Sequence, residues 1–390
     1  MLLSNTMNIL AGPAALTLLA ALCCCPLHAA AQAAPTPSPS PRPTAAPTVT
    51  WSGVLSTFGA QTTGVNASGA LDSQSGADNG SRVDWSNILI SVQRTAGTFR
   101  FGATLGSYAF PVAGQAINPT FQRNANTSLY GYVPSAYVQV VPDEHFTFSL
   151  GRLPTLLGQE NAFTFQNYNI QRGLAWNAEP VVSRGVRGQF TNGKLNAALE
   201  FNDGYYSGSH RAVEGSLAWS ATPSSALSFA FILPDADTPA NPTAFIANKS
   251  EYDLMFTGQY GKLSLTPYLL WVRSPKSAAA AFVNDESAFF ASALADFSFT
   301  DAFSIGARFE SAQNGSSPLD SSSNADFIGY GPGSNATTYT LTPQYKTKHF
   351  FARAEWSRVQ ADHVTRGFGF GSQGTGTSQT RVAAELGTQF

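Results

Sequence analysis

Charged residues are scarce in this chain of 390 residues. Asp, Glu, Lys and Arg together make up 12% of it, whereas about 25% is usual in soluble globular domains. The formal net charge of −2 provides no basic surface that would attract nucleic acid. The mean hydropathy of −0.07 and the lack of an apolar run of about 20 residues argue against a helical membrane protein.

Cysteine is nearly missing as well, and all three copies lie at positions 23–25. The apolar run 9–22 and the small residues at 29–31 predict a secretory signal peptide over residues 1–31. No Lys or Arg precedes that run, so a start at Met7 or an uncleaved signal anchor stays open. After cleavage the chain would hold no cysteine, which excludes disulfides, thiolate metal sites and thiol nucleophiles.

Residues 32–50 are rich in Pro, Thr, Ser and Ala. This composition favours an extended, unpacked spacer in the periplasm, with a contact to the cell wall as the alternative. The remainder, residues 51–390, has a periodic pattern and is predicted to form one structural unit.

The final stretch, residues 380–390, alternates between two kinds of side chain. Val382, Ala384, Leu386, Thr388 and Phe390 fall on one face, and Arg381, Ala383, Glu385, Gly387 and Gln389 fall on the other. A transmembrane β-barrel needs strands with one apolar and one polar face. In this respect the chain resembles outer-membrane β-barrel proteins of Gram-negative bacteria, which end in a strand with a terminal Phe. The resemblance implies that Phe390 is an assembly signal read by the outer-membrane insertion machinery.

From residue 51 onward, strand-like runs of about ten residues come in pairs. Short connections with turn-forming residues alternate with long ones. The short connections are expected at 96–97, 142–144, 192–193, 222–224, 260–261, 300–301 and 346–347, and the long ones at 62–81, 109–130, 153–181, 203–210, 233–249, 274–286, 312–334 and 360–377. This pattern predicts an all-β fold, a transmembrane antiparallel β-barrel of about sixteen strands with its tight turns in the periplasm. A β-sandwich would show the same alternation but offers no reason for the regular pairing of short and long connections.

Charged side chains in these runs repeatedly fall on the face opposite the apolar residues. In 302–311, Arg308 and Glu310 alternate with Ala307 and Phe309. A charge facing lipid at mid-bilayer costs about 2–4 kcal/mol, so this sorting places the charges inside the barrel. The candidates for the lumen wall are Arg100, Glu200, Glu214, Arg308, Glu310, Arg353, Glu355, Arg381 and Glu385. Aromatic residues near strand ends, among them Trp51, Tyr108, Tyr130, Trp219 and Tyr345, are expected to form girdles at the two membrane surfaces.

The connection 153–181 is unusually apolar for a loop in water, with Leu156, Leu157, Phe163 and Trp176. We expect it to fold into the barrel as a constriction loop, because buried loops often carry function. Charge at a narrow point sets ion preference, and the candidates in or beside this loop are Arg152, Glu160, Arg172, Glu179 and Arg187. The basic residues slightly outnumber the acidic ones, which favours a mild preference for anions. Alternatively, each of these residues could form an ion pair with another of them and only stabilise the loop.

The passage 151–187 resembles the OmpL-like β-barrel porin family. The matching positions are Gly151-Arg152, Thr155, Gly158, Glu160, Asn167, Asn169, Pro180 and Gly185-Val186-Arg187. A looser likeness exists to phosphate-selective porins. The resemblance implies a passive channel for small hydrophilic solutes or ions in the bacterial outer membrane. Its outer surface would contact lipid, and a homotrimer is one possible assembly.

Two other functions stay open. The barrel could be a non-conducting adhesin or scaffold, or it could be an outer-membrane hydrolase, for which the sequence offers no Ser/His/Asn constellation. We expect no catalytic residues, no cofactor and no metal site.

Overall fold

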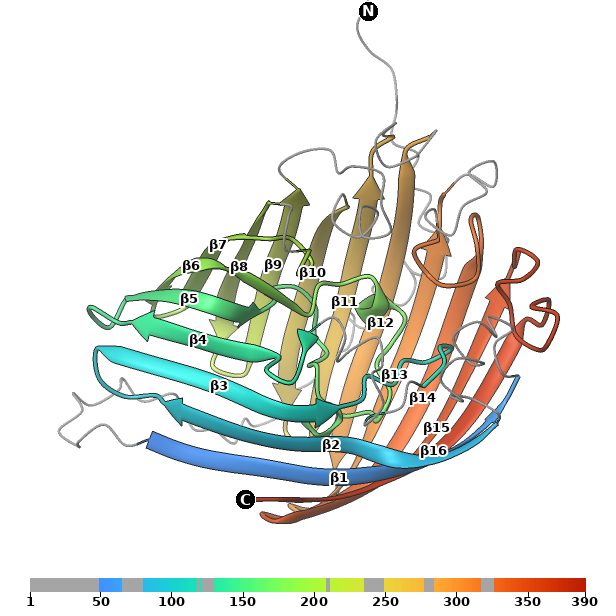
Figure 1. Cartoon of the computed structure of the whole chain (residues 1–390), viewed down its shortest axis with the longest axis horizontal. Helices are drawn as coiled ribbons and strands as arrows, with labels where there is room; N and C mark the ends of the chain where they lie inside the picture. The colour runs from blue at the N-terminus through green and yellow to red at the C-terminus, as the bar shows by residue number, and fades with distance from the viewer. Residues whose placement is uncertain are drawn as a thin grey trace, which may run out of the picture. The chain divides into compact units, whose positions relative to one another are not determined.

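The computed structural model describes residues 49–64, 80–117, 120, 130–207, 211–234, 249–276, 284–316 and 326–390. The predicted signal peptide and almost all of the predicted spacer lie outside these residues. Within them, sixteen strands form one closed antiparallel barrel (Figure 1). The strands are β1 Val49–Thr63, β2 Ser81–Arg94, β3 Phe99–Tyr108, β4 Ser135–Val140, β5 Phe146–Pro154, β6 Val182–Asn192, β7 Leu195–Asn202, β8 Ala212–Thr222, β9 Ser225–Pro234, β10 Ser250–Tyr260, β11 Leu263–Ser274, β12 Glu286–Ser298, β13 Phe303–Asn314, β14 Asn335–Lys346, β15 Phe350–Asp362 and β16 Ser378–Gln389.

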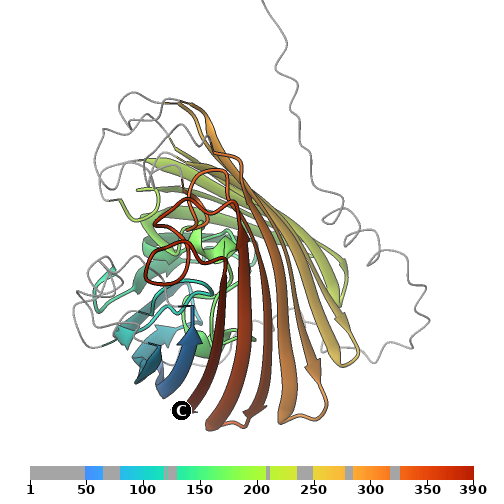
Figure 2. The same cartoon turned by 90° about the vertical axis from the view of Figure 1, so that its right-hand side faces the viewer.

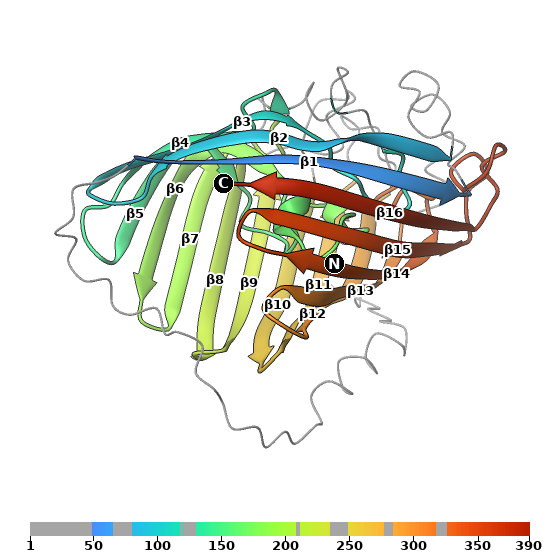
Figure 3. The same cartoon turned by 90° about the horizontal axis from the view of Figure 1, so that it is seen from below.

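The first and last strands close the barrel. β1 pairs with β16 in a register that joins Leu55 to Thr388 and Thr63 to Thr380, and Figure 3 shows the two strands side by side. Every other strand pairs with its neighbours in the sequence. The sheet therefore has no free edge, which satisfies the backbone groups that lipid cannot.

The predicted connections are confirmed, and with them the strand number. Seven tight turns join β2 to β3, β4 to β5 and so on to β14 and β15. Gly193 and Gly261 have φ values of 56° and 61° in two of these turns, a left-handed conformation that glycine adopts at little cost. The strand ends that the long connections join all lie at the opposite end of the barrel.

The predicted sorting of side chains between the two faces is also confirmed. On β16, Val382 and Leu386 are 53% and 52% exposed, whereas Arg381 and Glu385 are 1% and 0% exposed. Phe390 is 72% exposed, and its ring lies against the position that a side chain of Gly53 would occupy on the same outer face of β1. Its role as an assembly signal stays a prediction.

Two of the aromatic residues expected in the girdles lie inside the barrel instead. Tyr108 is fully buried, because it has the same parity on β3 as Thr104, which faces inward. Its hydroxyl donates a hydrogen bond to the carbonyl oxygen of Gly131 over 2.9 Å. Tyr130 packs against Phe110 in the same interior cluster. Trp51, Trp219 and Tyr345 do lie exposed on the outer face.

An apolar core fills one side of the barrel interior. The wall there is formed by β11–β15, which contribute Leu270, Phe290 and Val359. Four connections contribute the residues that cover this wall: Ala113 from the connection between β3 and β4, Leu174 from the one between β5 and β6, Ile328 and Tyr330 from the one before β14, and Phe370 from the one before β16. The other side of the interior, along β1–β5, contains a cavity. Figure 2 shows the C-terminus at the same end of the barrel as the tight turns of the C-terminal strands. No helix in the described part of the chain is both long and apolar enough to cross a bilayer.

Candidate functional site

The connection between β5 and β6, here called the crossing segment (residues 155–181), runs through the barrel interior (Figure 3). It contains two short 3₁₀ helices, Thr164–Gln166 and Ala175–Asn177. The segment starts and ends beside β5, yet it hydrogen-bonds to β13 and β15. Since β13 is opposite β5 in the ring of sixteen strands, the segment must cross the lumen to reach it.

Two carboxylates on the far wall hold the crossing segment. Glu355 on β15 accepts hydrogen bonds from the backbone N–H groups of Ile170 and Gln171 and from Gln171 Nε2, the last over 2.8 Å. Glu310 on β13 accepts one from the backbone N–H of Leu174 over 2.9 Å. Bonds to an ionised acceptor are stronger than neutral ones, so these contacts fix the middle of the segment against the wall.

An ion pair adds to this anchoring. Arg308 Nη1 on β13 lies 2.7 Å from Glu160 Oε1, and it also donates to the carbonyl oxygen of Gln171 over 2.6 Å. Glu160 Oε2 accepts a hydrogen bond from the backbone N–H of Gly173 over 2.6 Å. Burial raises the pKa of the Glu160 carboxyl, and the Arg308 guanidinium opposes that change. Both oxygens of Glu160 therefore have partners within the protein.

Arg172 and Glu179 are packed inside the crossing segment. Arg172 is fully buried, and its guanidinium carbon lies 5.4 Å from the ring centroids of both Phe110 and Trp176. Its two Nη atoms have no hydrogen-bond partner among the described residues. Burial lowers the pKa of Arg172 to about 9. The Tyr268 hydroxyl donates a hydrogen bond to Glu179, whose pKa burial raises well above its ordinary value.

The remaining predicted charges bond either to one another or to neutral groups of the protein. Arg187 Nε donates to Glu200 Oε2 over 2.6 Å, and Asn202 Nδ2 donates to both Glu200 and Glu214 over 2.9 Å each. Arg353 pairs with Glu385. Arg381 Nη1 donates to Gln171 Oε1 over 2.6 Å, and Arg100 Nε donates to the Gly97 carbonyl oxygen over 3.0 Å.

Arg152 requires a correction, because it does not face the interior. It has the same parity on β5 as Phe148 and Leu150, which are 50% and 57% exposed on the outer face. Its Nη1 atom donates to the carbonyl oxygen of Tyr130 over 3.1 Å and to that of Val133. The expected mild anion preference counted this charge among the pore residues, so its basis is lost.

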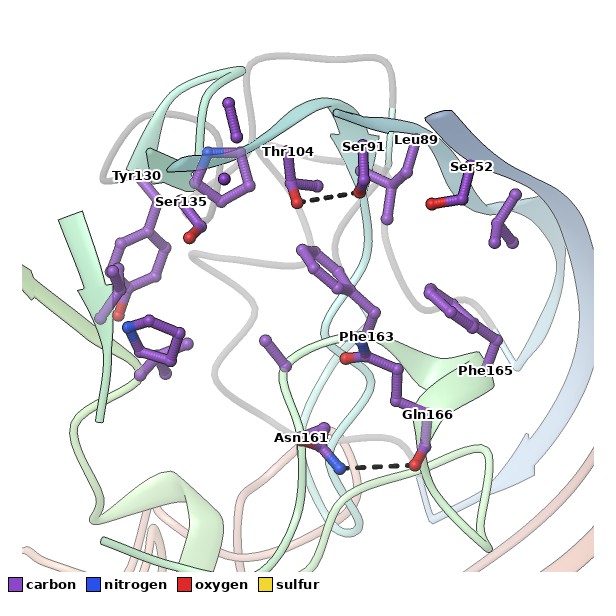
Figure 4. Close-up of a pocket in the computed structure, with 18 of the residues that line it drawn as sticks. Ser52, Leu89, Ser91, Thr104, Tyr130, Ser135, Asn161, Phe163, Phe165 and Gln166 are labelled. Atoms are coloured by element: carbon purple, nitrogen blue, oxygen red, sulfur yellow. Dashed lines mark hydrogen bonds between the residues drawn. The ribbon is translucent and has the colours of Figure 1, made fainter. Parts of the chain in front are cut away.

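An open cavity of about 600 Å³ remains between the crossing segment and strands β1–β5 (Figure 4). It extends from Ser52 and Gln389 at the tight-turn end to Phe110 and Tyr130 near the other end. The residues labelled in Figure 4 are Ser52, Leu89, Ser91, Thr104, Tyr130, Ser135, Asn161, Phe163, Phe165 and Gln166. Of the five predicted constriction residues, Glu160 alone is part of this lining.

The sequence reasoning missed these polar lining residues, because it looked only for charge. The parity of β2 and β3 would have placed Ser91 and Thr104 on the inner wall. No local signal could have identified Gln166, because the path of the crossing segment depends on its contacts with β13 and β15. No cluster of His, Cys, Asp or Glu that could hold a metal ion occurs in the described ranges.

Solved structures with the same barrel come from several bacteria. An anion-selective porin from Comamonas acidovorans has a TM-score of 0.57 at 13% identity, covering 88% of this chain and 99% of that one. The trimer form of OmpT from Vibrio cholerae has a TM-score of 0.56 at 11% identity, covering 89% and 100%. The outer-membrane channel DcaP of Acinetobacter baumannii has a TM-score of 0.53 at 10% identity, covering 88% and 97%. At these identities the likeness shows the fold.

A search of curated protein sequences found no match to the chain. The model of one protein family, described as putative beta-barrel porin-2, OmpL-like, matches residues 48–390. That match covers the whole barrel from β1 to β16. The chain is therefore a bacterial outer-membrane porin rather than an enzyme, and it belongs to this OmpL-like β-barrel porin family.

Proposed function

We propose that this porin is a passive diffusion channel for small hydrophilic solutes and ions, and that the crossing segment forms its narrowest part. The observation that carries the proposal is the path of this segment. It spans the lumen from β5 to β13, is held there by Glu310, Glu355 and Arg308, and leaves the cavity along β1–β5. Solutes that cross the barrel would pass through this cavity.

The size of the cavity would then set the upper limit for solutes. The predicted charges contribute little to selectivity in this proposal, because they bond to one another and to the backbone of the crossing segment. A charge that is already paired exerts a weaker field on a passing ion than a free one. We infer from this a channel with weak ion selectivity, in place of a mild anion preference.

Site-specific block of the conductance tests the proposal. The predicted mature chain has no cysteine, so a single introduced thiol reacts alone. Gln166 is exposed and lines the cavity. We expect the variant Q166C to conduct like the native protein in planar bilayers and to lose conductance when a cationic methanethiosulfonate reagent is added, because the attached group would occupy the path.

The variant N192C is the matched control. Asn192 is exposed in the tight turn between β6 and β7, away from the cavity, so labelling there should leave the current unchanged. Equal sensitivity of both variants would show that the cavity is not the path. A complete lack of conductance by the folded native barrel would favour the adhesin or scaffold function instead.

We further propose that the protein assembles as a homotrimer. Support comes from the similar OmpT barrel, which has been solved in a trimer form, and from the uneven barrel wall. β4 has six residues and β5 nine, against thirteen in β15. About 9–11 residues are needed to cross the bilayer core, so the wall near β4 is short for a surface that faces lipid alone.

A further inference from the structure

The chemistry of the cavity wall identifies a class of solute, an inference that depends on the proposed channel function. We propose that the cavity binds neutral, ring-shaped polyhydroxylated solutes, the saccharide class, in preference to ions. Three features of the wall support this assignment: the near absence of free charge, aromatic rings on both the crossing segment and the strand wall, and a set of uncharged groups that both donate and accept hydrogen bonds.

Charge is almost missing from the cavity wall. Of the side chains that line it, only those of Glu160 and Lys348 are charged. Both carboxylate oxygens of Glu160 already have partners, Arg308 and the backbone N–H of Gly173. Lys348 lies in the tight turn between β14 and β15, at the rim of the barrel. An ion that enters the cavity therefore gives up hydration without gaining a counter-charge, whereas a neutral solute avoids that cost.

Aromatic rings lie on two sides of the cavity. Phe163 and Phe165 of the crossing segment are within 8° of parallel, with ring centroids 6.2 Å apart, and the ring of Phe165 is only partly buried. On the strand wall of the cavity, Tyr137 of β4 lies close against Gly102, where an added Cβ would be 2.7 Å from Tyr137 Cζ. Because Gly102 has no side chain, the Tyr137 ring can lie against the strand at this position. Aromatic faces of this kind can pack against the C–H face of a sugar ring.

Hydroxyl and amide groups complete the wall. The hydroxyls of Ser91 and Thr104 lie 3.0 Å apart on neighbouring strands (Figure 4), and Ser135 and Gln166 line other parts of the cavity. Each of these groups can both donate and accept hydrogen bonds. Sugar hydroxyls do the same, whereas a simple anion can only accept. The volume of about 600 Å³ is in the range of small-molecule sites.

Saccharide block of the ion current tests the inference. KCl conductance of the purified full-length porin is recorded while lactose, or lactobionate of similar size and negative charge, is added. We expect lactose to reduce the current at a lower concentration than lactobionate does, and the reversal potential in a KCl gradient to lie near zero. We expect F165A and Y137A each to raise the half-blocking concentration of lactose by about two- to tenfold relative to that variant's own KCl current, the effect of losing one aromatic contact.

The variant F229A is the control, because Phe229 is 40% exposed on the outer face and its loss should not change the block. The inference is overturned if lactobionate blocks at a concentration equal to or lower than that of lactose, if the reversal potential shows strong ion preference, or if both aromatic variants keep the native half-blocking concentration. These outcomes all require a conducting channel. Absence of KCl conductance would instead contradict the proposed channel function itself.

Discussion

At the scale of single residues, the interior charges of this barrel act mainly as anchors. Glu355 alone accepts bonds from two backbone N–H groups and from the side chains of Gln171 and Thr342. Strand parity predicted correctly that such charges point inward. It could not predict what they bind, because partners such as Ile170 and Gln171 lie on the crossing segment, 185 and 184 residues away from Glu355 in the sequence. Arg152 was misplaced because it was treated as part of the loop, whereas it lies on the outer face of β5.

Replacing Glu355 should therefore loosen the crossing segment. In E355A, the backbone N–H groups of Ile170 and Gln171 lose their acceptor, and each unsatisfied buried group costs about 1–3 kcal/mol. We expect the folded band of E355A to disappear at a lower temperature than that of the native protein on heat-modification gels. E144A is the control, because the Glu144 side chain is 87% exposed in a tight turn. An unchanged transition temperature for E355A would show that this anchor contributes nothing to stability.

At the scale of elements, the strands and turns could be predicted almost completely. Alternation with a period of two and turn residues such as Asn192-Gly193 are local signals, and they were sufficient to identify all sixteen strands. The path of the crossing segment was harder to predict from the sequence. Its apolar residues indicated burial, but its contacts depend on which inner-wall side chains of β13 and β15 meet it across the lumen.

The alternation of tight turns and long connections predicts the orientation in the membrane. Epitope tags inserted within 312–334 or 360–377 should be reached by antibodies on intact cells, because long connections face outward in barrels of this kind. Tags at 192–193 or 346–347 should become accessible only after the outer membrane is permeabilised. Labelling in the reverse pattern would invert the assigned orientation, and labelling of all four positions on intact cells would indicate a damaged membrane.

At the scale of the whole molecule, the barrel wall is uneven. On β5 the exposed apolar positions Phe146, Phe148 and Leu150 are followed at once by Arg152. On β16 the outer face stays free of charge from Val382 to Phe390. A charge facing lipid is costly, so a neighbouring copy of the protein is the better cover for the short side.

Photo-cross-linking tests this arrangement of the proposed homotrimer. A benzophenone amino acid in place of Phe148 on the short side should yield covalent dimers and trimers of the purified porin. The same amino acid in place of Phe350, 43% exposed on β15, should give cross-links to lipid only. Cross-linked oligomers that arise from position 350 and not from position 148 would move the subunit contact to the tall side of the barrel.

The paired charges of the interior also restrict how this protein can evolve. If Arg353 or Glu385 were lost alone, its buried partner would remain uncompensated, at a cost of about 3–5 kcal/mol. During evolution, such a pair can therefore be replaced by other residues only when both positions change within a short time. The outer positions, by contrast, can drift among Val, Leu and Phe at little cost. In related proteins, the residues that face the lumen should therefore change more slowly than the residues on the outer face.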